Sequence, residues 1–183
     1  MKLSLEQANS CIKLLNQLDM LALDTFPIKH EDHTPESEEQ AILALRLKGR
    51  RRWQECSATF IDAYIGLHPE LTPQEIQNLK SWKNRQRQQY VVTSYTDDTA
   101  IVVHTNSMLT FEITHLTDTF SIVLNASELP TVIETTLLPY ENTIVWDGLI
   151  LLLTRGPVKK EIADFFNGFT DIIQKNNGVI RSL

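Results

Sequence analysis

The sequence predicts an α+β fold in which N-terminal helices precede a small antiparallel β-barrel or bent sheet of five to six strands and a C-terminal helix. Three patterns predict it. Apolar residues recur at helical spacing in the first half of the chain. From Tyr90 onward, short runs of β-branched and aromatic residues alternate with turn-forming residues. Near the C-terminus a helical pattern returns. We therefore expect a helical region at 1–88 and an antiparallel β unit with a closing C-terminal helix at 89–183.

The first predicted helix spans about residues 4–22, because Leu5, Ala8, Ile12 and Leu15 fall on one helical face. Polar residues interrupt its apolar positions, so it lacks the unbroken apolar stretch of a signal peptide. Nowhere does an apolar run approach the roughly 20 residues that span a bilayer. With 42% hydrophobic and 22% charged residues, the chain has a globular composition, and we expect a cytoplasmic protein without membrane contact.

A capping-box pattern of Ser37 and Gln40 predicts that the second helix begins near Glu38. Gly49 lies inside this helix, where glycine costs about 1 kcal/mol relative to alanine. We therefore expect the helix to bend or break at Gly49.

The third helix has the clearest start in the sequence. Thr72 is an N-cap residue, Pro73 occupies the first helical position, and Glu75 completes a capping box. The helix is expected over about residues 73–88.

Asp97-Asp98 and Asn106-Ser107 are predicted hairpin turns between strands, and Glu141-Asn142 lies in a tighter connection after Pro139. The strand runs are YVVTSY, TAIVVHT, MLTFEIT, TFSIVL, TVIETTLLP and NTIVWDGLILLLT. The final helix is expected to cover one opening of the barrel with an apolar stripe formed by Ile162, Phe165, Phe166, Phe169, Ile172 and Ile173.

Charge is distributed unevenly along this acidic chain, whose formal net charge is -6. Residues 46–87 hold nine basic and four acidic residues, a net charge of +5, whereas residues 88–154 hold eight acidic residues and no Lys or Arg, a net charge of -8. Oppositely charged surfaces steer association. This segregation favours a protein that binds a partner or its own copy.

One basic cluster consists of Arg46, Lys48, Arg50, Arg51 and Arg52. Neighbouring residues on a helix diverge by about 100°, so these side chains form a broad collar. One interpretation is phosphate contact with nucleic acid, which would weaken steeply with salt. The favoured interpretation is that the collar pairs with the acidic β unit or an acidic partner chain, since the β unit would repel a polyanion.

The pair Asp147-Gly148 interrupts an otherwise apolar strand, and glycine in a strand indicates a bulge or a close backbone approach. In a functional interpretation, Asp147 is a ligand-binding carboxylate flanked by Tyr140 and Trp146. In the structural interpretation, which we favour, Asp147 accepts backbone N–H bonds that hold a bulge or hairpin.

The remaining candidate residues are histidines, and none of them lies in a sequence motif of known chemistry. The loop from His30 to His33 contains two histidines and two acids, but no third His or Cys lies nearby, so we expect a solvated loop and no metal. His104 and His115 fall on predicted strands within reach of a possible pairing. Since neither a G-x-S-x-G motif nor a Gly-rich phosphate loop is present, we expect no catalytic residue and no cofactor.

Residues 136–150 read TLLPYENTIVWDGLI, and this run resembles a motif common in uncharacterised bacterial proteins, roughly LLPFxxxIIYDGLL. Tyr140 stands where that family usually has phenylalanine, and Trp146 where it usually has tyrosine. The resemblance extends over about residues 60–170. It implies the same order of helices followed by a barrel, and no established activity comes with it.

The leading functional prediction is a non-enzymatic cytoplasmic protein-interaction or regulatory module. Two alternatives stay open. One is nucleic-acid binding through the basic helices at 46–87, and the other is a small-molecule pocket near Tyr140, Trp146, Asp147 and Gly148.

Overall fold

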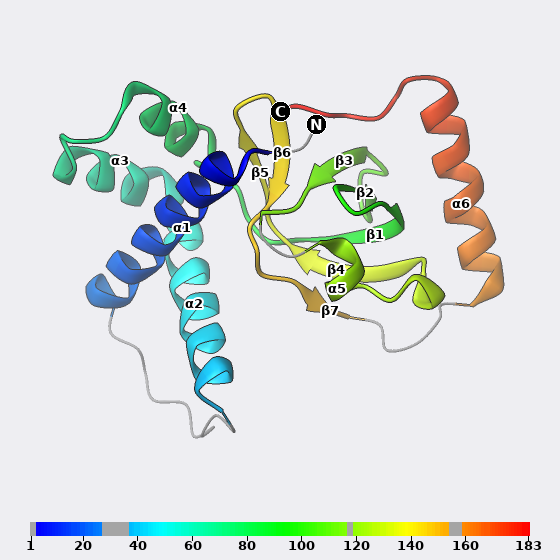
Figure 1. Cartoon of the computed structure of the whole chain (residues 1–183), viewed down its shortest axis with the longest axis horizontal. Helices are drawn as coiled ribbons and strands as arrows, with labels where there is room; N and C mark the ends of the chain where they lie inside the picture. Colours follow the sequence, from blue (N-terminus) through cyan, green and yellow to red (C-terminus); the bar gives the residue numbers. More distant parts are fainter. Residues whose placement is uncertain (1–2, 27–36, 117–118, 154–158) are drawn as a thin grey trace. The chain divides into compact units, whose positions relative to one another are not determined.

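The computed structural model describes residues 3–26, 37–116, 119–153 and 159–183 (Figure 1). Contacts divide the chain into two compact units. The helical unit comprises Asn9–Gln86, and the sheet unit comprises Met1–Ala8 together with Arg87–Leu183. The α+β class is confirmed.

Two helices of the first half, α2 and α4, begin where capping residues in the sequence predict them, whereas α3 follows α2 after a turn at Cys56 and has no side-chain cap. Ser37 accepts a hydrogen bond from the Gln40 N–H, and Thr72 and Glu75 form a complete capping box. The helices are α1 (Leu5–Thr25), α2 (Glu38–Glu55), α3 (Ser57–Leu67) and α4 (Pro73–Ser81). The last of these is shorter than the predicted helix at 73–88, because the chain turns at Asn84, whose φ is 63°.

The predicted break at Gly49 is wrong, since α2 continues through this residue and is interrupted only at Cys56. Gly49 has a packing role instead. A Cβ atom at this position would lie 2.5 Å from the carbonyl oxygen of Asp19, so only glycine lets α1 and α2 approach this closely.

The sheet unit contains a curled mixed sheet of seven strands in the order β5-β6-β3-β2-β1-β4-β7 (Figure 1). The strands are β1 (Gln88–Tyr95), β2 (Thr99–His104), β3 (Thr110–Thr114), β4 (Thr131–Thr135), β5 (Leu137–Tyr140), β6 (Thr143–Trp146) and β7 (Leu151–Leu152). The prediction of five to six antiparallel strands therefore needs two corrections. Two of the predicted strand runs each divide into two strands, and β3 pairs with β6 in parallel.

A third correction concerns the run TFSIVL, which forms the short helix α5 (Phe120–Val123) and not a strand. Its Phe120 is buried, with its ring centroid 5.4 Å from that of Trp146. The predicted turns are confirmed: β1–β2, β2–β3 and β5–β6 are all antiparallel hairpins, the last turning at Glu141 with a φ of 51°.

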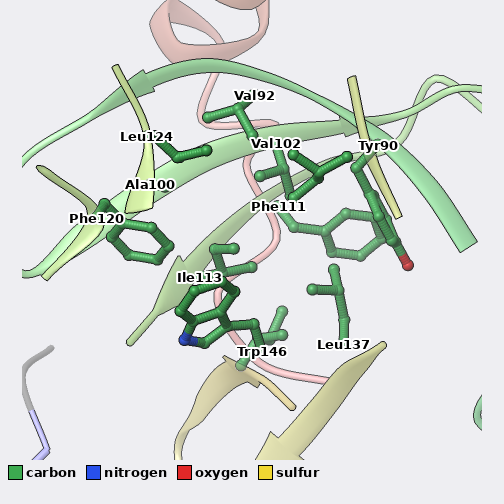
Figure 2. Packing of buried hydrophobic residues seen from close by; sticks show 12 residues of the cluster. Tyr90, Val92, Ala100, Val102, Phe111, Ile113, Phe120, Leu124, Leu137 and Trp146 are labelled. Carbon is green, nitrogen blue, oxygen red and sulfur yellow. The ribbon is translucent and has the colours of Figure 1, made fainter. Parts of the chain in front are cut away.

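The core of the sheet unit lies on the concave side of the curled sheet (Figure 2). Val92, Val102 and Ile113 come from three neighbouring strands, and Phe120 and Trp146 close the cluster. Burying a side chain of this size contributes about 1.5–3 kcal/mol. This shared core holds α5, β6 and the central strands together.

The C-terminal part packs on the same unit. Helix α6 (Lys160–Lys175) contacts β1, where the Thr170 hydroxyl donates a 3.3 Å hydrogen bond to Thr93. The residues after it return to the sheet, and Ile180 forms a parallel bridge with Phe111 on β3. Among the described helices, none is long and apolar enough to cross a membrane.

Candidate functional site

Asp147 lies immediately after β6 and is completely buried. Its Oδ1 atom accepts hydrogen bonds from the Leu149 N–H at 3.0 Å and from the Thr135 hydroxyl at 3.1 Å. The bond to the residue two positions ahead defines an Asx turn. Gly148 sits within that turn at a φ of 77°, a conformation that glycine adopts without strain. The sharp turn in the chain thus explains the Asp-Gly pair.

Arg87 completes this buried polar cluster from the start of the sheet unit. Its guanidinium donates to the Glu134 carboxylate at 3.1 Å, to the Glu134 carbonyl at 2.7 Å and to the Leu149 carbonyl at 3.2 Å. Its Nη1 atom also lies 3.8 Å from Oδ2 of Asp147. In the sequence, Arg87 stands out only as part of a basic segment, because its partners lie far along the chain.

The two aromatic residues proposed to flank Asp147 are buried in the protein. Trp146 belongs to the core cluster (Figure 2), and Tyr140 is also buried. Three cavities that the described residues form are lined by other side chains. Together with the Asx turn, these contacts support the structural interpretation of Asp147 that the sequence favoured.

The basic cluster does not form one surface. Arg50 is fully buried, and it makes a two-point ion pair with Asp19 on α1. Arg51 and Arg52 are exposed, with Arg52 lying 3.5 Å from Glu55, while Arg46 and Lys48 are partly buried. The expected pairing of the whole collar with one acidic surface is therefore not possible for Arg50.

A signal for this ion pair was present in the sequence. Asp19 falls among the apolar positions of the first helix, next to Leu18 and four residues after Leu15. An acid on a buried helical face requires a partner, since an isolated buried charge is strongly unfavourable. Trp53 supplies a further contact, donating its indole N–H to Asp19 at 2.9 Å.

The two strand histidines do not pair, because the β2–β3 register places them at opposite ends of the hairpin. The Nδ1 atom of His104 accepts a bond from the Ser107 N–H at 3.2 Å and lies 2.7 Å from its hydroxyl, so this ring caps the turn. His115 is mostly buried, with Nε2 4.0 Å from Asp98.

The remaining chemical candidates carry little support. The loop from His30 to His33 lies outside the described residues. Within the parts of the chain that the structure describes, no group of three or more His, Cys, Asp or Glu side chains could hold a metal ion. Neither Cys11 nor Cys56 is in a disulfide. Burial, and next the Glu55 carboxylate, raise the pKa of Cys56, which keeps its thiol protonated near neutral pH.

Helix α6 exposes several large apolar side chains. On α6, Thr170 faces the sheet, whereas Phe165 and Ile172 are 58% and 60% exposed and Ile162 is also exposed. All three exposed residues belong to the apolar stripe that the sequence predicts to cover the barrel. The helix is therefore rotated so that half of the apolar stripe is exposed and the other half, Phe166, Phe169 and Ile173, is partly buried.

The helical unit has an apolar groove between α1 and α2, with a volume of about 430 Å³. Its walls include Met20, Leu23, Ile42 and Leu45, and Met20 is 58% exposed. A second cavity, of about 420 Å³, continues along α1 past Ile12 and shares Asn16 and Met20 with the first. The first hollow lies between the two helices, whereas the second is lined by residues of α1 alone.

No family model matches the sequence, and no curated protein or solved structure matches it either. The resemblance of residues 136–150 to the LLPFxxxIIYDGLL motif therefore stays a prediction. Any function proposed for this chain is therefore argued from its own side chains and surfaces.

Proposed function

We propose that this chain is a non-enzymatic protein-interaction module of the cytoplasm. The observation that supports this proposal is the exposed apolar edge of α6, formed by Ile162, Phe165 and Ile172. Exposed apolar side chains that gather on one helix mark a surface for association, whereas scattered ones do not. Cysteines that form no disulfide are typical of a protein from a reducing compartment.

The polar clusters favour the same proposal. Asp147 accepts hydrogen bonds from the Leu149 N–H and the Thr135 hydroxyl, and Arg87 donates to Glu134 and to the Leu149 carbonyl. In the helical unit, Asp19 forms an ion pair with Arg50. Most of these bonds join residues that lie far apart in the sequence. These clusters therefore serve the fold, and the surface carries the function.

A capture experiment tests the proposal. The wild-type protein and the double variant Phe165→Ser/Ile172→Ser are immobilised and exposed to extract of the source organism, and any retained protein is then purified and its affinity measured directly. We expect a partner that binds the wild type and loses at least tenfold in affinity for the variant. The matched control is Asn167→Ser/Gln174→Ser, which changes exposed polar positions of the same helix. Equal binding by all three proteins, or no direct binding, contradicts the proposal.

A further inference from the structure

The apolar groove between α1 and α2 lies entirely within the helical unit, and its volume of about 430 Å³ is that of a small-molecule site. Such sites commonly measure about 300–1,000 Å³ and combine apolar walls with a few polar groups. Three of the apolar lining residues, Met20, Ile42 and Leu45, are exposed. Covering them with an aliphatic chain would remove apolar surface from water, which is favourable.

Two charged side chains, Asp19 and Arg46, belong to the described lining of this groove. The Asp19 carboxylate is already engaged inside the unit. Its Oδ1 atom accepts hydrogen bonds from Arg50 and Trp53, and its Oδ2 atom accepts a second bond from Arg50. Arg46 is therefore the charged group that remains for a ligand in the groove.

Arg46 is a partly buried cation with an unused donor. Its Nε atom is buried and has no hydrogen-bond acceptor, and Arg46 forms no ion pair with any residue that the structure describes. Attraction between opposite charges is stronger in partly dehydrated surroundings than in water. A guanidinium also binds a carboxylate through two parallel hydrogen bonds. The groove thus places a carboxylate-binding group beside an apolar wall.

We propose that the groove binds an aliphatic carboxylate of the fatty-acid type, with its carboxylate on the accessible part of the Arg46 guanidinium and its chain against Met20, Leu23 and Ile42. An aliphatic ammonium would meet a like charge at Arg46, and an alcohol would gain no ion pair. This inference goes beyond the proposed function, because the site lies in the helical unit and contains no residue of α6.

The proposal is tested by isothermal titration calorimetry of the full-length protein with decanoate, decanol and decylammonium, each below the concentration at which it aggregates. The three probes share one chain length and differ in the head group. We expect one decanoate to bind per protein chain. Decanol and decylammonium should bind more weakly by about tenfold or more, because neither forms an ion pair with Arg46.

Two matched pairs of variants locate the site on α2. Arg46→Gln should weaken decanoate binding by about tenfold or more, whereas Arg51→Gln, at an exposed position outside the groove, should not change it. Ile42→Ser should also weaken binding, whereas Leu43→Ser, at the next exposed position, should not. Circular dichroism checks the fold of each variant. If Arg46→Gln is unfolded, Arg46→Lys replaces it and should bind decanoate less tightly than the wild type, because an ammonium lacks the planar fork.

The exposed apolar edge of α6 is the rival site for an aliphatic ligand, so Phe165→Ser/Ile172→Ser should bind decanoate like the wild type. The proposal is overturned if decanoate does not bind, if decylammonium binds equally well, if Arg46→Gln has no effect, or if the α6 variant loses binding. Capture of a protein through Ile42 without any binding of decanoate also rejects it. None of these results decides whether a partner protein binds through Phe165, so the proposed function stands or fails separately.

Discussion

Asp19 and Arg50 form a two-point ion pair inside the helical unit, with N–O distances of 2.8 and 2.9 Å. Neither side chain is more than 2% exposed. The guanidinium also lies over the Trp53 ring, 5.9 Å from its centroid. Because the two residues come from α1 and α2, the pair specifies how these helices align, and the groove on their outer side depends on that alignment.

Removing one charge of this pair should be costly. We expect Asp19→Asn to lower the free energy of unfolding by about 3–5 kcal/mol, because it leaves the Arg50 guanidinium buried without its carboxylate. Urea denaturation followed by tryptophan fluorescence measures the loss. Asp24→Asn, at an exposed position of the same helix, is the control and should change stability little. A small effect of Asp19→Asn would show that water or another acid compensates Arg50.

Two glycine substitutions should have opposite effects. Gly49→Ala places a methyl group 2.5 Å from a backbone oxygen of α1, and we expect it to lower stability by about 1–3 kcal/mol. Gly66→Ala, in α3, meets no atom within 4 Å and should raise stability by up to about 1 kcal/mol through helix propensity. Thermal unfolding of both variants compares them directly. Stabilisation by Gly49→Ala would contradict the close helix packing.

The Asx turn at Asp147 leads to a third prediction. Asp147→Asn removes the negative charge near Arg87 and weakens the bonds that hold the turn, so we expect a clearly lower melting temperature, corresponding to about 1–3 kcal/mol. Asp97→Asn, at an exposed hairpin turn, serves as the comparison. An unchanged melting temperature for Asp147→Asn would show that the turn does not need the carboxylate.

Tyr64 should lose its phenolic proton only at a pH above the usual range for tyrosine. Burial, with a further contribution from the Glu70 and Glu75 carboxylates, raises the pKa of Tyr64 to about 12. Since this value lies above the usual 10 of an unfolded chain, its stabilising contribution is complete below about pH 10 and is lost as pH rises through about 12.

Tyrosinate absorbance as a function of pH measures this titration. We expect a titration step with a pKa of about 12 in the wild type, and this step should be missing from Tyr64→Phe. If the wild type and the variant titrate with the same profile apart from amplitude, the shift is absent.

Local signals predicted much of the fold. The capping residues at Thr72 and Glu75 act within one helical turn, and the change of composition at Tyr90 marks the first strand because strand propensity is expressed residue by residue. The α5 segment shows the limit of this reasoning. Its sequence is typical of a strand, but burial of Phe120 against Trp146 is obtained in a helical turn, and strand propensity depends strongly on such context.

The polar clusters could be predicted only in part. The Asp-Gly pair indicated a specific backbone structure, because the signal is confined to adjacent residues. The partners of Arg50 and Arg87 lie 31 and 47 residues away, so a pattern along the chain cannot assign them. Rotation of α6 about its own axis was equally hidden, since an apolar stripe does not tell which of its edges the sheet covers.

Both ends of the described chain belong to the sheet unit. Leu3 is buried there, the Gln7 amide donates to the Glu141 carboxylate, and Ile180 pairs with β3. The chain leaves this unit after Ala8 and returns at Arg87. In terms of gene architecture, the helical unit is thus an insert within a host domain. A deletion of residues 9–86 bridged by a short linker would keep every strand of the host, whereas trimming a few residues from either terminus would remove part of it.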